Sequence, residues 1–211
     1  TGMLTDREFL FKLLRVCREM DIFLVVDECF QDFIRDPGQY SLKAQLPRYH
    51  NLFLLKAFTK RYAMAGVRLG YGITENEELL EKMTLATQPW NISVPAQAAG
   101  IAALKETEYV EKARELIFEE AEYLSDELFK LGMTVFPSQA NYLFFKGPED
   151  LFEICVRQNV LIRDCSNYPG LGKGFYRVAV RTHEENEQLI RTIHDGLMEV
   201  RKKVQQEEEE Q

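Results

Sequence analysis

The stretch IFLVVDECF, Ile22–Phe30, decides the fold class, because it is a continuous apolar run that ends in an acid. A strand that is apolar on both faces is typical of a parallel sheet covered by helices. A second run of this kind, NLFLLKAFTK at residues 51–60, predicts the neighbouring strand. A third, VRLGYGIT at residues 67–74, follows too closely for a helical crossover, so we expect it to pair antiparallel with its neighbour.

Helical periodicity surrounds these strands. It runs through residues 5–20 and through residues 75–131, with an interruption near Pro95. After Gly132 the pattern changes to short strands, expected at 133–138, 141–147, 160–165 and 175–181, and to helices, expected at 148–158 and 183–203. The acidic run QQEEEEQ that closes the chain is expected to be a frayed, solvated helix end.

The chain is therefore predicted to be α/β with two domains, residues 1–110 and residues 111–211. The boundary is expected inside a long helix, between residues 105 and 125. The second domain mixes short strands with helices and is predicted to be α+β.

Composition limits the classes of function. An apolar fraction of 45% with 28% charged residues is that of a globular protein rather than a disordered one. A net charge of −8 disfavours nonspecific binding to nucleic acid, whose phosphates reward basic surfaces. No apolar run is long enough to span a bilayer, so no membrane partner is expected. Four cysteines without CxxC spacing indicate reduced thiols and a cytoplasmic location, and three unclustered histidines do not favour a metal site.

An acid and a lysine stand where two of the predicted strands end. Asp27 and Lys60 fall at the carboxyl ends of parallel strands, where open α/β sheets bind ligands. A lysine amine can form a Schiff base with an aldehyde cofactor, and an acid can keep a pyridine nitrogen protonated. Thr59 beside the lysine, and Arg68 beyond a tight turn at Gly66, have the chemistry to grip a phosphate.

Each residue also has an ordinary interpretation. Asp27 alone could cap a turn or pair with a surface base, and Lys60 alone could be a solvated loop lysine. Their combination with Thr59 and Arg68 in register favours the functional interpretation. Glu28 and Asp32, in the same run, are interpreted as loop or pairing acids.

The run AFTKRYAMAGVRLGYG, residues 57–72, resembles the Schiff-base segment of fold-type I pyridoxal-phosphate enzymes of the class I/II aminotransferase superfamily. VVDECF resembles the segment that carries their pyridine-nitrogen aspartate, and Thr1 and Gly2 look like the end of their Asn-Pro-x-x-Pro-Thr-Gly segment. The resemblance covers nearly the whole chain. It implies that residues 1–110 are the C-terminal portion of the large cofactor-binding domain, with a mostly parallel sheet and helices. Residues 111–211 are then the small C-terminal α+β domain, and a long N-terminal portion is missing.

The resemblance implies pyridoxal 5′-phosphate as the cofactor, held by Asp27, Phe30, Thr59, Lys60 and Arg68, with Lys60 and Asp27 catalytic. Phe30 stands where typical transaminases of the group have a tyrosine bonded to the cofactor's ring oxygen, so one hydrogen bond to the cofactor is lost. The resemblance also implies a homodimer whose active sites are completed by the partner subunit.

Two arginines of the second domain stand on predicted neighbouring strands. In the family, the arginine at the position of Arg177 is expected to clamp the substrate α-carboxylate, and that of Arg163 to assist where the substrate is phosphorylated. Without the family, both could be charges that keep an edge strand soluble. Arg181 is left open between a substrate contact and a structural ion pair, and Trp90 is expected to pack between domains.

Within the superfamily, DECFQDF, FTK, IRDCSNYPGLG and YRVAVR look most like the branch of threonine-phosphate decarboxylases, which serve cobalamin biosynthesis. The alternative branch is histidinol-phosphate or other amino-acid aminotransferases. A hypothesis of another class is a truncated fragment that folds and dimerises without binding cofactor.

Overall fold

A computed structural model describes residues 1–209, which form two compact units. One unit is Leu4–Arg114, and the other joins Thr1–Met3 to the chain from Glu115 onward. The division falls within the long helix α6, Thr107–Lys130. Assignment of the units to a cofactor-binding domain and a small domain stays a prediction.

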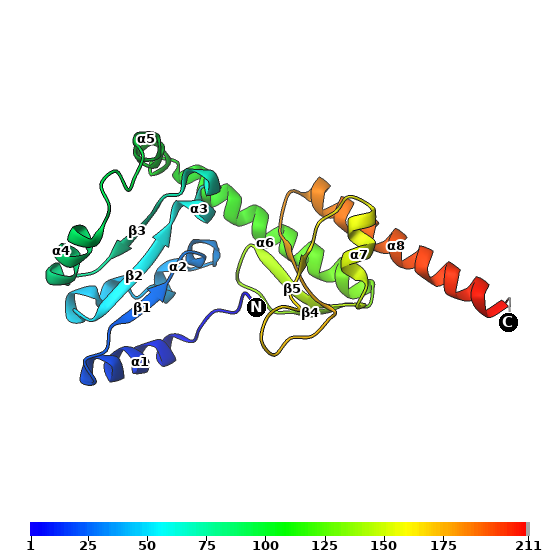
Figure 1. Ribbon diagram of the computed structural model, residues 1–211, viewed down its shortest axis with the longest axis horizontal. Helices are drawn as coiled ribbons and strands as arrows, with labels where there is room; N and C mark the ends of the chain where they lie inside the picture. The colour runs from blue at the N-terminus through cyan, green and yellow to red at the C-terminus, as the bar shows by residue number, and fades with distance from the viewer. Residues whose placement is uncertain (210–211) are drawn as a thin grey trace. The chain divides into compact units, whose positions relative to one another are not determined.

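The first unit is built on a three-stranded sheet with the order β1-β2-β3, drawn in blue to green in Figure 1. Its strands are β1 Leu24–Asp27, β2 Leu52–Ala57 and β3 Gly70–Ile73. β1 and β2 are parallel, with Leu24 opposite Leu52, and β2 and β3 are antiparallel, with Ala57 opposite Gly70. The three strands and the antiparallel return of the third are confirmed.

Helix α1, Arg7–Glu19, supplies Leu14 to the core of this unit. Asp6 caps the helix by accepting a hydrogen bond from the Phe9 amide at 2.8 Å, because a short acidic side chain can reach an unpaired amide of the first turn. Leu14 packs in a buried cluster with residues of β2 and of the segment between the strands, namely Leu42, Leu46, Leu52 and Leu54.

The remaining elements of the first unit are short, apart from two helices of ten residues. They are η1 Gln31–Phe33, α2 Pro37–Tyr40, η2 Lys43–Arg48, α3 Phe58–Arg61, η3 Ala65–Val67, α4 Glu77–Ala86 and α5 Val94–Ala103. Pro95 lies in the first turn of α5, where its missing N–H costs nothing, so it begins this helix rather than interrupting it.

The faces of β1 are not equally covered. Val25 is 56% exposed and Phe23, just before the strand, is 46% exposed. The apolar run was expected to be buried on both faces, and in the described residues it is covered on one. Trp90, expected to pack between domains, is 94% exposed.

The second unit has a four-stranded antiparallel sheet with the order β4-β5-β7-β6. Its strands are β4 Thr134–Phe136, β5 Tyr142–Lys146, β6 Arg163–Asp164 and β7 Phe175–Ala179. With it go α7 Leu151–Arg157 and α8 His183–Glu209. Leu124 and Leu128 of α6, Phe145 of β5 and Ile193 of α8 are fully buried in one core.

Two features at the ends of the chain complete this unit. The Gly2 carbonyl accepts a hydrogen bond from the Gln139 amide at 2.7 Å, which ties the first residues to the segment before β5. α8 continues to Glu209, six residues past its expected end at 203. Most of the acidic run expected to fray is therefore helical, and its last residues, 210–211, lie outside the described part of the chain.

The four cysteines are free thiols, and Cys17, Cys155 and Cys165 are buried. A cytoplasmic location stays a prediction. Over residues 1–209, we find no helix with the length and apolar character needed to cross a bilayer.

Candidate active site

Asp27 is the last residue of β1, and its side chain is exposed at the carboxyl edge of the sheet. It pairs in register with Leu55, so β2 continues for two further residues beyond this level. The Asp27 Oδ1 atom accepts a hydrogen bond from the Cys29 amide at 2.9 Å. In the described residues the carboxylate makes no ion pair, which leaves it able to receive a cationic partner.

Lys60 lies on the single helical turn α3 that follows β2 directly. Phe58, 6% exposed, anchors the turn: its amide donates to the Leu69 carbonyl at 3.1 Å, and its ring stacks on Tyr62 at 5.3 Å between centroids. Thr59 is half-buried beside it. Because the anchor points into the unit, the Lys60 side chain is exposed, and none of the carboxylates that the structure describes pairs with its amine.

Phe30 contacts the same lysine. The Lys60 Nζ atom lies 5.5 Å from the centroid of the Phe30 ring, within the range of a cation–π interaction. Phe30 and Lys60 are 30 residues apart in the chain but meet at one edge, because β1 and β2 are adjacent and parallel. The phenylalanine therefore borders the amine itself, a contact that sequence reasoning missed.

Arg68 lies immediately before Leu69 and β3, which starts opposite the end of β2. Its backbone is left-handed, with φ 57° and ψ 49°, and its guanidinium donates to the Ala65 carbonyl at 2.9 Å. The turn was expected to depend on Gly66, but Gly66 has no positive φ, and Arg68 itself takes the left-handed conformation. A non-glycine residue in this left-handed conformation costs about 1 kcal/mol or more in conformational free energy. Backbone strain of this kind is concentrated at functional sites.

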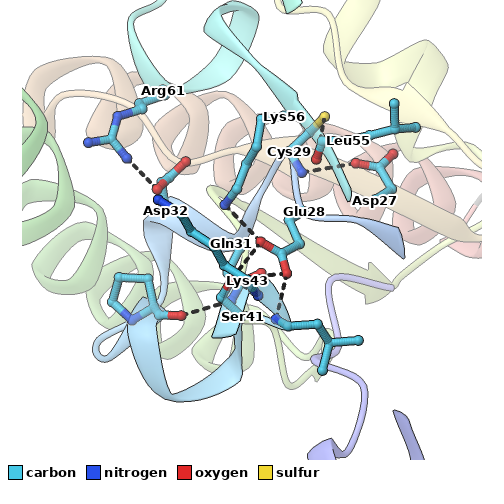
Figure 2. Close-up of polar contacts among 12 residues, drawn as sticks. Asp27, Glu28, Cys29, Gln31, Asp32, Ser41, Lys43, Leu55, Lys56 and Arg61 are labelled. Carbon is cyan, nitrogen blue, oxygen red and sulfur yellow. Dashed lines mark hydrogen bonds and ion pairs between the residues drawn. The ribbon is translucent and has the colours of Figure 1, made fainter. Parts of the chain in front are cut away.

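The acids next to Asp27 have internal partners (Figure 2). Glu28 is 3% exposed and its Oε2 lies 3.0 Å from the Lys56 amine, while Asp32 forms an ion pair with Arg61. Both are pairing acids, one of the two interpretations left open. Burial and the neighbouring Asp27 carboxylate raise the pKa of the Cys29 thiol to about 12, so this thiol is protonated at neutral pH.

The buried pair of Glu28 and Lys56 was missed by sequence reasoning. The signal was a lysine in the apolar run LFLLKA, since a buried cation needs a partner. The partner lies 28 residues earlier in the chain, so only the parallel pairing of β1 and β2 identifies it.

Arg163 and Arg177 belong to the second unit and are register partners on β6 and β7. The Arg177 guanidinium lies 4.6 Å from the Tyr142 ring centroid, and Arg163 donates to Asn167 Oδ1 at 3.3 Å. Like charges directly opposite on two strands destabilise a sheet. Neither arginine forms an ion pair within the described residues, so the pair presents unneutralised positive charge.

Arg181 forms an ion pair with Glu185 at 2.6 Å, the structural alternative left open for it. Among the side chains that the structure describes, no group of three or more His, Cys, Asp or Glu is arranged to hold a metal ion.

The residues at the carboxyl edge of the first unit's sheet have the chemistry to hold pyridoxal phosphate. Lys60 supplies a reactive amine, Asp27 an anion for a ring nitrogen, and Arg68 a cation for a phosphate, and none of the three is neutralised by an ion pair in the described residues. Lys56 does not fit the amine's role, because Glu28 holds it.

Comparison with known proteins agrees with this chemistry. The family described as aminotransferase class I and II matches residues 1–193. A threonine-phosphate decarboxylase of Salmonella typhimurium is 33% identical over 201 residues, which are 93% of this chain and 55% of the relative. A histidinol-phosphate aminotransferase of Anaeromyxobacter is 36% identical over 180 residues, 82% of this chain and 48% of the relative.

Solved structures give the same result for the fold. The histidinol-phosphate aminotransferase of Clostridium acetobutylicum superposes with a TM-score of 0.87 at 32% identity, over 92% of this chain and 60% of that one. The chain thus spans about half the length of the curated relatives it matches.

Proposed function

The chain belongs to the aminotransferase class I and II family, whose cofactor is pyridoxal phosphate, and from that premise we propose that it carries the cofactor-holding lysine of an enzyme acting at the α-carbon of a phosphorylated amino acid or amine. One observation carries the proposal. Asp27, Lys60 and Arg68 reach the same edge of one sheet with their charges unpaired among the described side chains.

Each residue at this edge has one task. Lys60 binds the aldehyde of the cofactor, Asp27 keeps the ring nitrogen protonated, and Arg68 with Thr59 binds the phosphate. When bound, pyridoxal phosphate supplies an aldehyde that condenses with amines and a ring that accepts an electron pair. Phe30 borders the Lys60 amine and shields one side of it from water.

The substrate is proposed to be anionic, because Arg163 and Arg177 stand side by side with no carboxylate to neutralise them in the described chain. Two forked guanidinium groups suit a carboxylate and a phosphate on one molecule. Arg177 is proposed to hold the α-carboxylate and Arg163 to assist with the phosphate. By orienting the substrate, the two arginines determine which bond at the α-carbon breaks.

We favour decarboxylation of threonine phosphate, as in cobalamin biosynthesis, because the Salmonella relative with that name matches 93% of this chain. Transamination of histidinol phosphate is the second candidate, supported by the 36% identical relative and by the superposition at TM-score 0.87. We further propose that the enzyme is a homodimer, supported by exposed apolar side chains on and beside α4 and α5, among them Leu85, Trp90 and Ile101.

The test of cofactor binding is borohydride reduction of the protein after incubation with pyridoxal phosphate, followed by peptide mass spectrometry. We expect the label on Lys60 and its loss in Lys60→Ala. Lys56 is the matched internal control, since it is only four residues away but held by Glu28. A label on Lys56, or none on any lysine of the intact natural protein, would refute the assignment. If the chain dimerises but carries no pyridoxal label after reduction, this would support the hypothesis of a non-catalytic fragment instead.

A second experiment separates the two reactions. The intact natural protein is given threonine phosphate alone, and in a separate assay histidinol phosphate with 2-oxoglutarate. Release of carbon dioxide from the first supports decarboxylation. Formation of glutamate in the second shows transamination and overturns our preference.

A further inference from the structure

We propose that Glu28 and Lys56 form a buried positioning unit that holds the Asp27 carboxylate in place for the cofactor. The inference rests on the proposed function and adds two residues that do not themselves touch the cofactor. The two neighbouring acids differ in burial: Asp27 is exposed at the strand end, and Glu28 is 3% exposed.

Four polar contacts fix the Glu28 carboxylate (Figure 2). Its Oε1 accepts from the Leu42 amide at 2.9 Å and from Ser41 Oγ at 3.1 Å. Its Oε2 accepts from Ser41 Oγ at 2.9 Å and lies 3.0 Å from Lys56 Nζ. One side chain thus ties the end of β1 to β2 and to the segment before η2.

The backbone transmits this restraint to Asp27. The Glu28 amide donates to the Leu55 carbonyl at 3.0 Å, which extends the sheet one residue beyond β1. The next amide, that of Cys29, donates to Asp27 Oδ1 at 2.9 Å and so sets the direction of the carboxylate. Because Glu28 lies between the two, loosening its side chain frees both Asp27 and the amide that orients it.

Burial and charge balance make the restraint stiff. The Glu28 and Lys56 side chains are 2% and 13% exposed, so each would be left as an uncompensated charge without the other. The same segment continues to Phe30, whose ring borders Lys60. The unit therefore also restrains the short segment that joins Asp27 to Phe30, the residue beside the Lys60 amine.

The test measures discrimination rather than affinity alone. Dissociation constants are measured, for the intact natural protein freed of cofactor, with pyridoxal phosphate and with its 1-deaza analogue, in which carbon replaces the ring nitrogen. Their ratio reports the interaction of Asp27 with that nitrogen. A merely structural role of Glu28 would weaken both ligands equally and leave the ratio unchanged.

We expect the wild-type protein to prefer pyridoxal phosphate at least tenfold and Asp27→Asn to lose the preference. Glu28→Gln, which keeps the shape of the side chain, should lower the ratio at least threefold, and Ser41→Ala should lower it less. The matched control is Glu78→Gln, which removes a carboxylate from an exposed lysine pair and should leave the ratio unchanged. Where Glu28→Gln folds poorly, the double variant Glu28→Gln/Lys56→Met removes both charges together.

A wild-type ratio in Glu28→Gln and in the double variant, with Asp27→Asn lowering it, would overturn this inference and leave the proposed function standing. An unchanged ratio in Asp27→Asn, or no binding of either ligand, would overturn both.

Discussion

At the scale of the residue, Asp27 and Glu28 show what a sequence can and cannot predict. A strand-end acid is visible in the chain as the point where an apolar run stops, and Asp27 lies at that point. The burial of Glu28 depends on Ser41 and Lys56, which lie 13 and 28 residues away, so no local pattern indicates it. Local patterns therefore predict the residues that face a ligand better than they predict the buried residues that keep those side chains in position.

Cys29 provides a probe of the Asp27 charge. Its thiol pKa is raised to about 12, first by burial and then by Asp27, so at pH 8 its thiolate fraction is about a thousandfold below that of an ordinary thiol of pKa 9.0. We expect slow alkylation of Cys29 by iodoacetamide at pH 8. Removing the negative charge lowers the pKa, so Asp27→Asn should react faster, while Lys56→Met, which removes a pKa-lowering cation, should react more slowly. Equal rates in wild type and Asp27→Asn would contradict this.

We expect Arg68 to contribute to cofactor binding at a cost in the free energy of unfolding, because its backbone is strained. Glycine accepts φ 57° without strain but costs more chain entropy on folding, so Arg68→Gly should change the free energy of unfolding by about 0 to +1 kcal/mol. The same variant should weaken binding of pyridoxal phosphate, whereas Arg68→Lys should retain both the strain and the charge. Urea unfolding and cofactor titration measure the two quantities. A loss of more than about 1 kcal/mol in Arg68→Gly would show that the bond to Ala65 outweighs the strain.

At the scale of the element, the three strands of the first unit and the pairing of β3 were predictable, because continuous apolar runs and short connections are local signals. The short helices between β1 and β2 were not predicted, since helices of four to six residues carry little periodicity. Pro95 was misread for a different reason: its effect depends on whether it stands in the first turn or in the interior of a helix.

β3 depends on a glycine that the sequence alone does not distinguish from its neighbours. A Cβ at Gly72 would overlap the ring of Phe53, which is 6% exposed and cannot swing into solvent. Gly72→Ala should therefore lower the free energy of unfolding by about 1 to 3 kcal/mol. Gly66→Ala is the control, because nothing lies within 4 Å of a Cβ there, and it should stay within about 0.5 kcal/mol of wild type. Thermal or urea unfolding measures the free energies of unfolding of the two variants. Equal losses in Gly72→Ala and Gly66→Ala would refute a steric role for Gly72.

At the scale of the whole molecule, the two units differ in how well they bury their apolar residues. The core of the second unit includes Tyr176, Phe145 and Leu151, each 1% exposed or less, and draws on both sheet and helices. The first unit has the smaller cluster around Leu14 and leaves Val25 and Leu55 of its strands exposed. Sequence patterning did not predict this difference, because exposure of an apolar strand depends on what covers it.

The difference predicts unequal protection against hydrogen exchange. Both β2 and β5 are central strands with hydrogen-bonded neighbours on each side, so pairing alone would protect them equally. Because β5 lies over the larger core, we expect its amides at Leu143–Phe145 to exchange at least about tenfold more slowly than those of β2 at Leu52–Leu54 in the cofactor-free chain. Exchange followed by mass spectrometry resolves the two strands. Adding pyridoxal phosphate should slow exchange in β1 and α3, where Asp27 and Lys60 lie, and leave β5 unchanged. Protection that rises in β5 and not in α3 would place the cofactor elsewhere and contradict the proposed site.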